Sequence, residues 1–311
     1  MPSRSDEQVI TPHLLRNWPL PDPQGDKKSR GTVLVVGGAR FTPGSVLLAG
    51  VSALRAGAGR LQLAVNASTA AALSIAVPEA KVVGLPEPGV DLPDELLKLA
   101  READVLAIGP GLDDIDETAR LMRELLTEAS KDAAVVLDAY ALGALSNEPD
   151  LIAGRSQRVV LTPNVIEAEH LLGREPGEDL AAAAHALAER YGATVSLYGH
   201  IAAPDGGAWR EESGDAGLGT SGSGHSRSTR GVMTCSSDRL GIDVLLPGRR
   251  GALGVQVLDV VEQLRLQLPV HPAPGAKSVG GRHAQGGGNR GLATDVEPRL
   301  YDTGSSCGLG Y

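Results

Sequence analysis

Residues 31–45 read GTVLVVGGARFTPGS, and this stretch carries the pattern that decides the fold. Residues 32–36 form a short apolar run rich in β-branched side chains, which predicts a strand buried on both faces. Two glycines close the run, and the apolar residues of 45–58 then follow helical spacing. A buried strand that passes through a glycine turn into a helix is typical of a parallel α/β sheet.

The same alternation continues along the chain to residue 197. We expect further strands at 61–65, 105–108, 134–137, 159–161 and 193–197, and helices at 14–18, 116–129, 166–172 and 180–191. Strands that alternate with helices predict a three-layer α/β/α fold with a mostly parallel central sheet. In such a sheet, ligands bind beyond the carboxyl ends of the strands.

The composition narrows the class of partner. The chain has 311 residues, 42% of them hydrophobic, and a net charge of −9, which disfavours nucleic acid and anionic membranes as partners. No apolar run of membrane-spanning length and no signal-peptide core stand out, so we expect a cytoplasmic protein. Cys235 and Cys307 lie far apart, and no metal-ligand spacing is present, so we expect no metal site built by the protein alone.

The pattern of the chain changes after Gly224. Residues 253–268 allow one further helix, whereas the last forty residues are rich in Gly, Pro, Arg and Ser. Such a composition cannot bury enough apolar surface to offset the entropy of ordering. We therefore expect one domain over residues 1–271 and a disordered tail over residues 272–311.

Polar groups and glycines follow several of the predicted strands. Gly109-Pro110-Gly111 and the loop at 37–45 would let backbone approach a ligand, although tight structural turns explain them as well. Asp138 follows a buried strand and suits either Mg²⁺-bound water or a helix cap. Thr162 or Asn164 would cap the next helix, with Glu167 in its first turn, and Asn164 could also touch a substrate.

Residues 219–224 read GTSGSG and are the most informative segment. Glycines with small hydroxyl residues can form a nest of N–H groups for phosphate, but by composition alone a flexible linker fits equally well. A carboxylate after these glycines would activate a hydroxyl group, and His225 stands in that place.

Taken in order, these segments resemble the ADP-dependent NAD(P)H-hydrate dehydratases of the ribokinase-like superfamily. The resemblance covers residues 8–224 and rests on segments 31–38, 77–79, 108–112, 136–139, 161–164 with Glu167, and 219–224. It implies that ADP drives the loss of water from hydrated NADH or NADPH (NADHX or NADPHX), yielding NAD(P)H, AMP and phosphate. It also implies Mg²⁺ and a homotetramer.

The resemblance assigns site residues by position. Those that would face the hydrated nicotinamide nucleotide are Ser45, Gly111 and Asn164. Those that would face the adenine nucleotide are Tyr198, Gly199, His200, Ile201, Ala202, Gly222, Ser223 and Gly224. His225 would stand in place of the catalytic Asp of the family.

The chain also departs from the family pattern. The family usually has His at 164, Gly at 166 and Lys-Gly at 198–199, whereas this chain has Asn164, Ile166 and Tyr198-Gly199. Everything after Gly224 departs, which motivates the hypothesis of a reading-frame change near codon 225. Two alternatives therefore stay open: an ATP-dependent kinase for a hydroxymethylpyrimidine or a sugar, and a catalytically dead nucleotide-binding protein.

Overall fold

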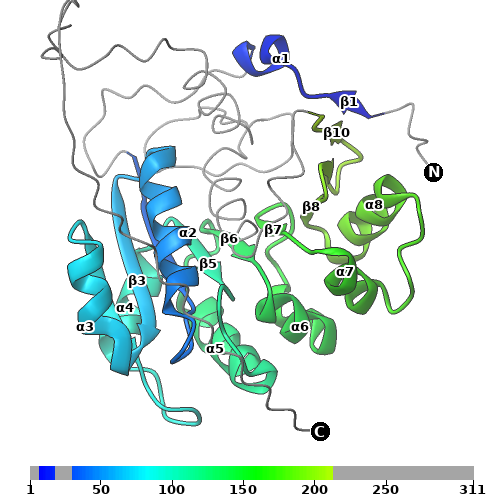
Figure 1. Cartoon of the computed structure of the whole chain (residues 1–311). Coiled ribbons are helices and arrows are strands. Elements are labelled where there is room, and N and C mark those ends of the chain that lie inside the picture. The colour runs from blue at the N-terminus through cyan, green and yellow to red at the C-terminus, as the bar shows by residue number, and fades with distance from the viewer. Residues whose placement is uncertain (1–6, 18–29, 213–311) are drawn as a thin grey trace, which may run out of the picture. The chain divides into compact units, whose positions relative to one another are not determined.

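The computed structural model describes residues 7–17 and 30–212 of the chain. Within these ranges, ten strands form one sheet with helices on both faces (Figure 1). The predicted three-layer α/β/α fold with a mostly parallel sheet is therefore confirmed.

The sheet has the strand order β1-β10-β9-β8-β7-β6-β5-β2-β3-β4. Neighbouring strands from β4 across to β8 are parallel, β9 is antiparallel to both β8 and β10, and β1 pairs in parallel with β10. The strands are β1 (Gln8–Val9), β2 (Thr32–Val36), β3 (Arg60–Asn66), β4 (Ala80–Leu85), β5 (Val105–Ile108), β6 (Ala134–Leu137), β7 (Val159–Leu161), β8 (Thr194–Leu197), β9 (His200–Ala202) and β10 (Ala208–Arg210).

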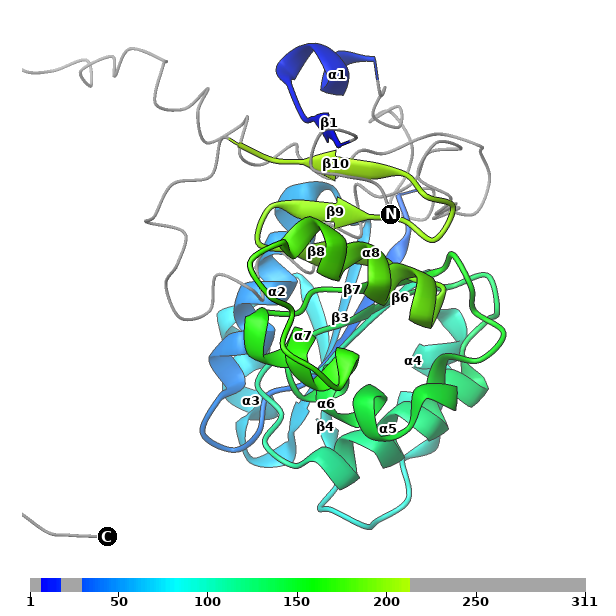
Figure 2. The ribbon, with the colours of Figure 1, turned by 90° about the vertical axis from the view of Figure 1, so that its right-hand side faces the viewer.

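Helices α2 and α3 cover one face of the sheet, and α4 to α8 cover the other, as the separation of α2 and α3 from α4 and α5 shows in Figure 2. Alternate side chains of β2 enter opposite layers: Val33 and Val35 pack with α2, whereas Leu34 and Val36 pack on the other side. The helices are α1 (Pro12–Arg16), α2 (Pro43–Ala56), α3 (Ala67–Ala76), α4 (Asp94–Glu102), α5 (Ile115–Glu128), α6 (Tyr140–Asn147), α7 (Val165–Leu172) and α8 (Leu180–Tyr191), with a 3₁₀ turn η1 (Pro149–Ile152).

The predicted elements are present with shifted ends. The first long helix begins two residues before the predicted start because Pro43 occupies its first turn, where a missing N–H costs nothing. The short N-terminal helix lies at Pro12–Arg16 rather than 14–18, with Thr11 accepting a hydrogen bond from the Leu14 N–H. No described helix is long and apolar enough to cross a membrane.

Charged side chains hold the connections at the amino ends of the strands. The Asp104 carboxylate, just before β5, accepts a hydrogen bond of 2.7 Å from the Thr32 N–H at the start of β2. Arg155, which precedes β7 and is only 2% exposed, donates to the carbonyls of Leu126, Ala129 and Ser130 at the end of α5. Burial raises the pKa of Asp104 and lowers that of Arg155. We call this side of the sheet the amino edge.

Candidate active site at the carboxyl edge of the sheet

The opposite side, which we call the carboxyl edge, is where β2 and β5 to β8 end. The connections after β2 and β5 are joined there by backbone hydrogen bonds. The Gly38 N–H donates to the Pro110 carbonyl (2.8 Å), and the Ala39 N–H donates to the Gly111 carbonyl (2.7 Å). The Thr42 hydroxyl adds a bond of 2.6 Å to the Gly111 carbonyl. Two loops that lie about seventy residues apart thus form one surface.

Glycine is required at two positions of this surface. A Cβ atom on Gly109 would lie 1.9 Å from the Asp138 carbonyl oxygen, and φ of Gly109 is 119°, which L side chains rarely adopt. A Cβ on Gly111 would lie 2.9 Å from the Ser45 hydroxyl oxygen and 2.7 Å from the Thr42 carbonyl oxygen. The structure therefore brings Ser45 and Gly111 together, as the two were grouped from sequence.

Asp138 lies at the end of β6, next to the loop of Gly109. Its buried carboxylate accepts a hydrogen bond of 2.9 Å from the Thr162 hydroxyl, which follows β7. Of the two alternatives for Asp138, the helix cap is wrong, because Ala139 is the N-cap residue of α6 and no side chain caps that helix. Asp138 is instead a carboxylate fixed at the carboxyl edge.

The described side chains differ in how well they suit the two ways in which a protein can bind Mg²⁺. Within residues 7–17 and 30–212, no group of three or more His, Cys, Asp or Glu side chains could hold a metal ion. Mg²⁺ commonly uses one or two carboxylates together with substrate phosphates. The described residues therefore fit an ion that arrives with nucleotide phosphates near Asp138, and they do not fit one bound by protein side chains alone.

Asn164 begins α7 and forms a complete capping box with Glu167. The Glu167 N–H donates to Asn164 Oδ1 (2.9 Å), and the Asn164 N–H donates to Glu167 Oε2 (2.8 Å). The predicted cap at Asn164 is confirmed. Since the cap uses the side-chain oxygen, the amide NH₂ of Asn164 is the group that can donate to a ligand. Thr162 does not cap the helix but bonds to Asp138 and to the Leu137 carbonyl.

The segment at 198–202 forms the turn from β8 into β9. Tyr198 and Gly199 make the turn itself, at the carboxyl edge, whereas the side chains of Ile201 and Ala202 are buried in the core. The His200 ring places Nδ1 2.9 Å from a carboxylate oxygen of Glu7, a residue of the N-terminal arm. Sequence reasoning missed that partner because 193 residues separate the two.

The remaining predicted site residues lie outside the described residues. These are Gly222, Ser223, Gly224 and the candidate base His225, and the same holds for the domain boundary at 271 and the tail at 272–311. Sequence reasoning also passed over two aromatic residues at the carboxyl edge, Phe41 and Tyr140. A usable signal was present, since the chain has only eight aromatic residues and these two closely follow predicted strands.

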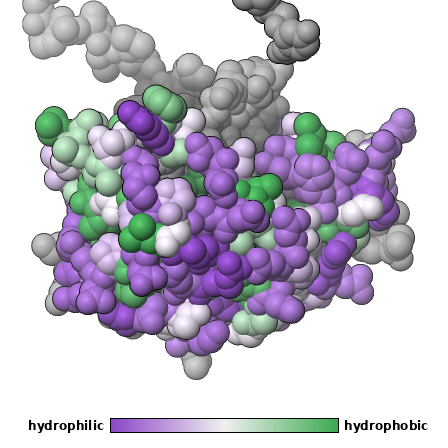
Figure 3. All heavy atoms as spheres, turned by 90° about the horizontal axis from the view of Figure 1, so that it is seen from below, coloured by the Kyte–Doolittle hydropathy of each residue, from purple (hydrophilic) through white to green (hydrophobic). Residues whose placement is uncertain are grey.

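Shifted pKa values in the described part of the chain belong to groups away from the candidate site. Within α5, Arg120 lowers the pKa of Glu117, and Lys81 of β4 lowers the pKa of Glu95 in α4. On the face seen in Figure 3, hydrophilic side chains predominate and hydrophobic ones are scattered among them. These charges fit a solvated surface rather than a second chemical site.

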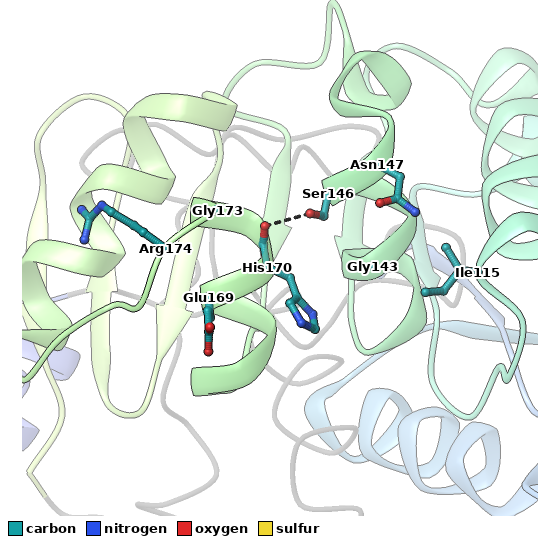
Figure 4. A pocket seen from close by; sticks show the side chains of 8 residues that line it. All are labelled: Ile115, Gly143, Ser146, Asn147, Glu169, His170, Gly173 and Arg174. Atoms are coloured by element: carbon teal, nitrogen blue, oxygen red, sulfur yellow. Dashed lines mark hydrogen bonds between the residues drawn. The ribbon is translucent and has the colours of Figure 1, made fainter.

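A separate hollow of about 450 Å³ lies between α6, α7 and the start of α5 (Figure 4). Within this hollow, the Ser146 hydroxyl donates a hydrogen bond of 2.8 Å to the His170 carbonyl. Most of its lining residues lie in the second halves of α6 and α7 or just after α7, away from the carboxyl edge at which these helices begin. The hollow therefore contains none of the predicted site residues.

The glycine loops, Asp138, Asn164 and the turn at Tyr198 thus gather at one edge, and comparison with known proteins gives this arrangement a family. A family model described as NAD(P)H-hydrate dehydratase matches residues 33–234. The chain belongs to this family. The ADP-dependent (S)-NAD(P)H-hydrate dehydratase of Xanthomonas campestris pv. campestris is 43% identical over 227 residues, covering 70% of this chain and 76% of that protein.

Other members of the NAD(P)H-hydrate dehydratase family agree. A bifunctional NAD(P)H-hydrate repair enzyme of Moorella thermoacetica is 36% identical, but this chain spans only 45% of its length. The ADP/ATP-dependent NAD(P)H-hydrate dehydratase of Bacillus subtilis, co-crystallized with ATP/Mg²⁺, superposes with a TM-score of 0.61 at 25% identity, covering 78% of this chain and 86% of that one. Family and fold therefore agree with the resemblance seen in the sequence.

Proposed function

We propose that this protein catalyses the ADP-dependent dehydration of hydrated NADH or NADPH, yielding NAD(P)H, AMP and phosphate. The observation that carries the proposal is the convergence of the family's glycine loops at the carboxyl edge, where Ser45 and Gly111 meet. The similarity to the Xanthomonas relative, an ADP-dependent (S)-NAD(P)H-hydrate dehydratase, supports it.

The proposed roles follow the positions of the residues along this edge. Ser45, Gly111 and the amide NH₂ of Asn164 would hold the hydrated nicotinamide nucleotide. The turn of Tyr198 and Gly199 would hold the adenine nucleotide, and His200, Ile201 and Ala202, which the resemblance assigns to the same nucleotide, would support this turn as strand β9. The N–H groups of Gly222, Ser223 and Gly224 would stabilise charge on the transferring phosphate.

Mg²⁺, when bound with the nucleotide, would neutralise phosphate charge, and Asp138 is the described carboxylate placed to hold it or its water. The proton of the hydrate's hydroxyl must move to a base as that oxygen takes phosphate. His225 occupies the position of the family's Asp. A neutral imidazole can accept the proton only if a ring nitrogen reaches the hydroxyl, and its protonated form cannot balance the metal.

The direct test is a turnover assay with hydrated NADH, in which the return of reduced nicotinamide absorbance is followed with ADP or with ATP. Turnover with ADP that releases AMP and phosphate supports the proposal. Phosphorylation of a small alcohol by ATP, with no repair of hydrated NADH, would instead support the kinase alternative. Nucleotide binding without either reaction would identify a catalytically dead protein.

The contribution of position 225 is tested by three proteins: the unmodified chain, His225→Asp, and His225→Asp joined to a family-like C-terminal segment. General-base help is typically worth about 10²–10⁴-fold in rate, so we expect turnover to rise in that order. Full family-level turnover by the unmodified chain would show that His225 is an adequate base or that the base lies elsewhere.

We also propose that the protein is a cytoplasmic homotetramer. The uncharged helix α3 supports self-association, because it leaves Ile75 82% exposed and Leu48 of the neighbouring α2 is also exposed. Light scattering on the unmodified protein and on Ile75→Glu tests this. A tetramer that Ile75→Glu breaks would support the α3 surface as an interface, and a monomer in both would exclude it.

A further inference from the structure

The described ranges contain five aromatic side chains, which divide sharply by exposure. Tyr191 and Trp209 are buried in the core. Phe41, Tyr140 and Tyr198 are 87%, 39% and 63% exposed. The three exposed rings lie on connections that leave the carboxyl ends of β2, β6 and β8, which is the edge of the candidate site. Every exposed aromatic ring of the described ranges is thus presented to solvent where ligands are expected.

The backbone at Tyr198 is not one that this side chain favours. Tyr198 and Gly199 have φ of 47° and 86° in the two-residue turn between β8 and β9. Turns with positive φ at both central residues favour Asn-Gly, and a bulky residue in the first position is strained. Local stability therefore does not explain a tyrosine here, and strain of this kind is found where function requires a side chain.

The Tyr198 turn is also rigidly supported. The Glu211 N–H donates to the Gly199 carbonyl over 2.8 Å, and the His200 ring pairs with Glu7. Strand β9 is flanked by β8 and β10. The ring of Tyr198 is thus presented from a fixed strand end, which is the support that a stacking surface needs.

Phe41 has comparable surroundings at the other end of the site. Its loop is fixed by the bond from the Thr42 hydroxyl to the Gly111 carbonyl, and Ser45 lies four residues further on, in the first turn of α2. The Arg40 guanidinium lies 5.4 Å from the centroid of the Phe41 ring. A cation near an exposed ring suits a ligand that carries a flat ring close to phosphate.

We infer that Tyr198 and Phe41 are two ring-stacking surfaces, Tyr198 for the adenine of ADP and Phe41 for the carboxamide-bearing ring of the nicotinamide nucleotide. This assignment rests on the proposed function. Four strand spacings separate β8 from β2, so the strands that lead to the two rings lie roughly 19 Å apart, which leaves room for two separate bases with phosphates between them. The lysine usual in the family at position 198 would act through charge, whereas tyrosine recognises a base by its face.

Binding measurements on four variants test the assignment: Tyr198→Asn, Tyr198→Phe, Phe41→Ser and Phe41→Tyr. Calorimetry with ADP and, separately, with NADH does not depend on turnover. Loss of one stacking contact typically corresponds to about tenfold weaker binding. We expect Tyr198→Asn to weaken ADP about tenfold and leave NADH within twofold, and Phe41→Ser to do the reverse. The Phe and Tyr replacements should bind like the unmodified protein.

Folding is controlled in the same experiment. Because Asn-Gly suits the turn, Tyr198→Asn should melt at or above the temperature of the unmodified protein while it loses ADP affinity. Tyr140→Ser, an exposed aromatic to which no ligand is assigned, should change neither affinity. If the unmodified protein binds both ligands and the variants bind equally well, the ring assignment is wrong and the proposed function stands. If it binds neither ligand, both fail.

Discussion

The two edges of the central sheet are built by different means. At the amino edge, charged side chains reach across to backbone groups, as Asp104 does to Thr32 and Arg155 does to the end of α5. At the carboxyl edge, backbone meets backbone through glycines, and three aromatic side chains are exposed. The first construction closes the surface with side chains, whereas the second leaves aromatic rings exposed to solvent. The comparison explains how one sheet can combine a rigid amino edge with a carboxyl edge that is open to a ligand.

Gly109→Ala should produce the largest loss of stability, because an added methyl group would enter the Asp138 carbonyl. We expect the free energy of unfolding to fall by about 3 kcal/mol or more in urea titrations. Gly154→Ala is the matched control, since Gly154 also has positive φ (73°) but has no atom within 4 Å of the added carbon. Its cost should be only about 1 kcal/mol. Equal losses would mean that the close approach at Gly109 is unimportant.

Arg155→Met tests the amino edge. Removing the guanidinium leaves the buried carbonyls of Leu126 and Ala129 and the partly buried carbonyl of Ser130 without their donor, so we expect a loss of about 3 kcal/mol, measured by urea unfolding. The affinity for ADP should not change while the protein is folded. Arg158→Met, which removes a partly exposed donor to the Asp132 carbonyl, is the comparison and should cost about 1 kcal/mol. A large change in ADP affinity with Arg155→Met would contradict the view that the amino edge supports the fold and the carboxyl edge binds the nucleotide.

Asn164 allows structure and binding to be separated at one residue. Asn164→Ser keeps an N-cap oxygen and should leave stability within a few tenths of a kcal/mol, whereas Asn164→Ala should cost about 1 kcal/mol. Both variants lose the amide NH₂, so both should raise KM for hydrated NADH. An unchanged KM in the serine variant, with a folded protein, would show that Asn164 serves only as a cap.

Asp104→Asn should have the smallest effect on the free energy of unfolding, and this effect should depend on pH. Burial raises the pKa of Asp104 above its usual 3.8, so its contribution to stability is present below that value and is lost as pH rises through the folded-state pKa. The amide can still accept the Thr32 N–H bond. Because the side chain is only partly buried, the variant should gain no more than a few tenths of a kcal/mol at neutral pH. Unfolding curves at pH 3 and pH 7 would show this, and a gain larger at pH 3 would have the wrong sign.

The sequence was sufficient for most of the central sheet. The apolar runs predicted the parallel strands β2 to β8 other than β4, and the rule on strand ends placed Gly111, Asp138 and Asn164 at one edge. Strand β4 and helices α4 and α6 were not predicted. Helix α3 was missed because ASTAAALSIA has no charged face to give it a helical period. Strands β9 and β10 were missed because three residues are too few to show alternation.

Other features depend on contacts that local patterns do not carry. The pairing of Glu7 with His200 joins residues from opposite ends of the described fold. The positive φ of Tyr198 follows from the length of the turn rather than from a residue that favours it. The N-cap position of α6 likewise falls on Ala139 rather than on Asp138, although Asp is the residue type that commonly caps helices.

The central claim is that the nucleotide binds at the carboxyl edge, and hydrogen exchange with and without ADP tests it most directly. The account predicts slower exchange at the amides of residues 37–45, 109–112 and 198–201 when ADP and Mg²⁺ are present, with little change at 104 and 155–158. Protection confined to the amino edge, or to the hollow between α6 and α7, would contradict the account.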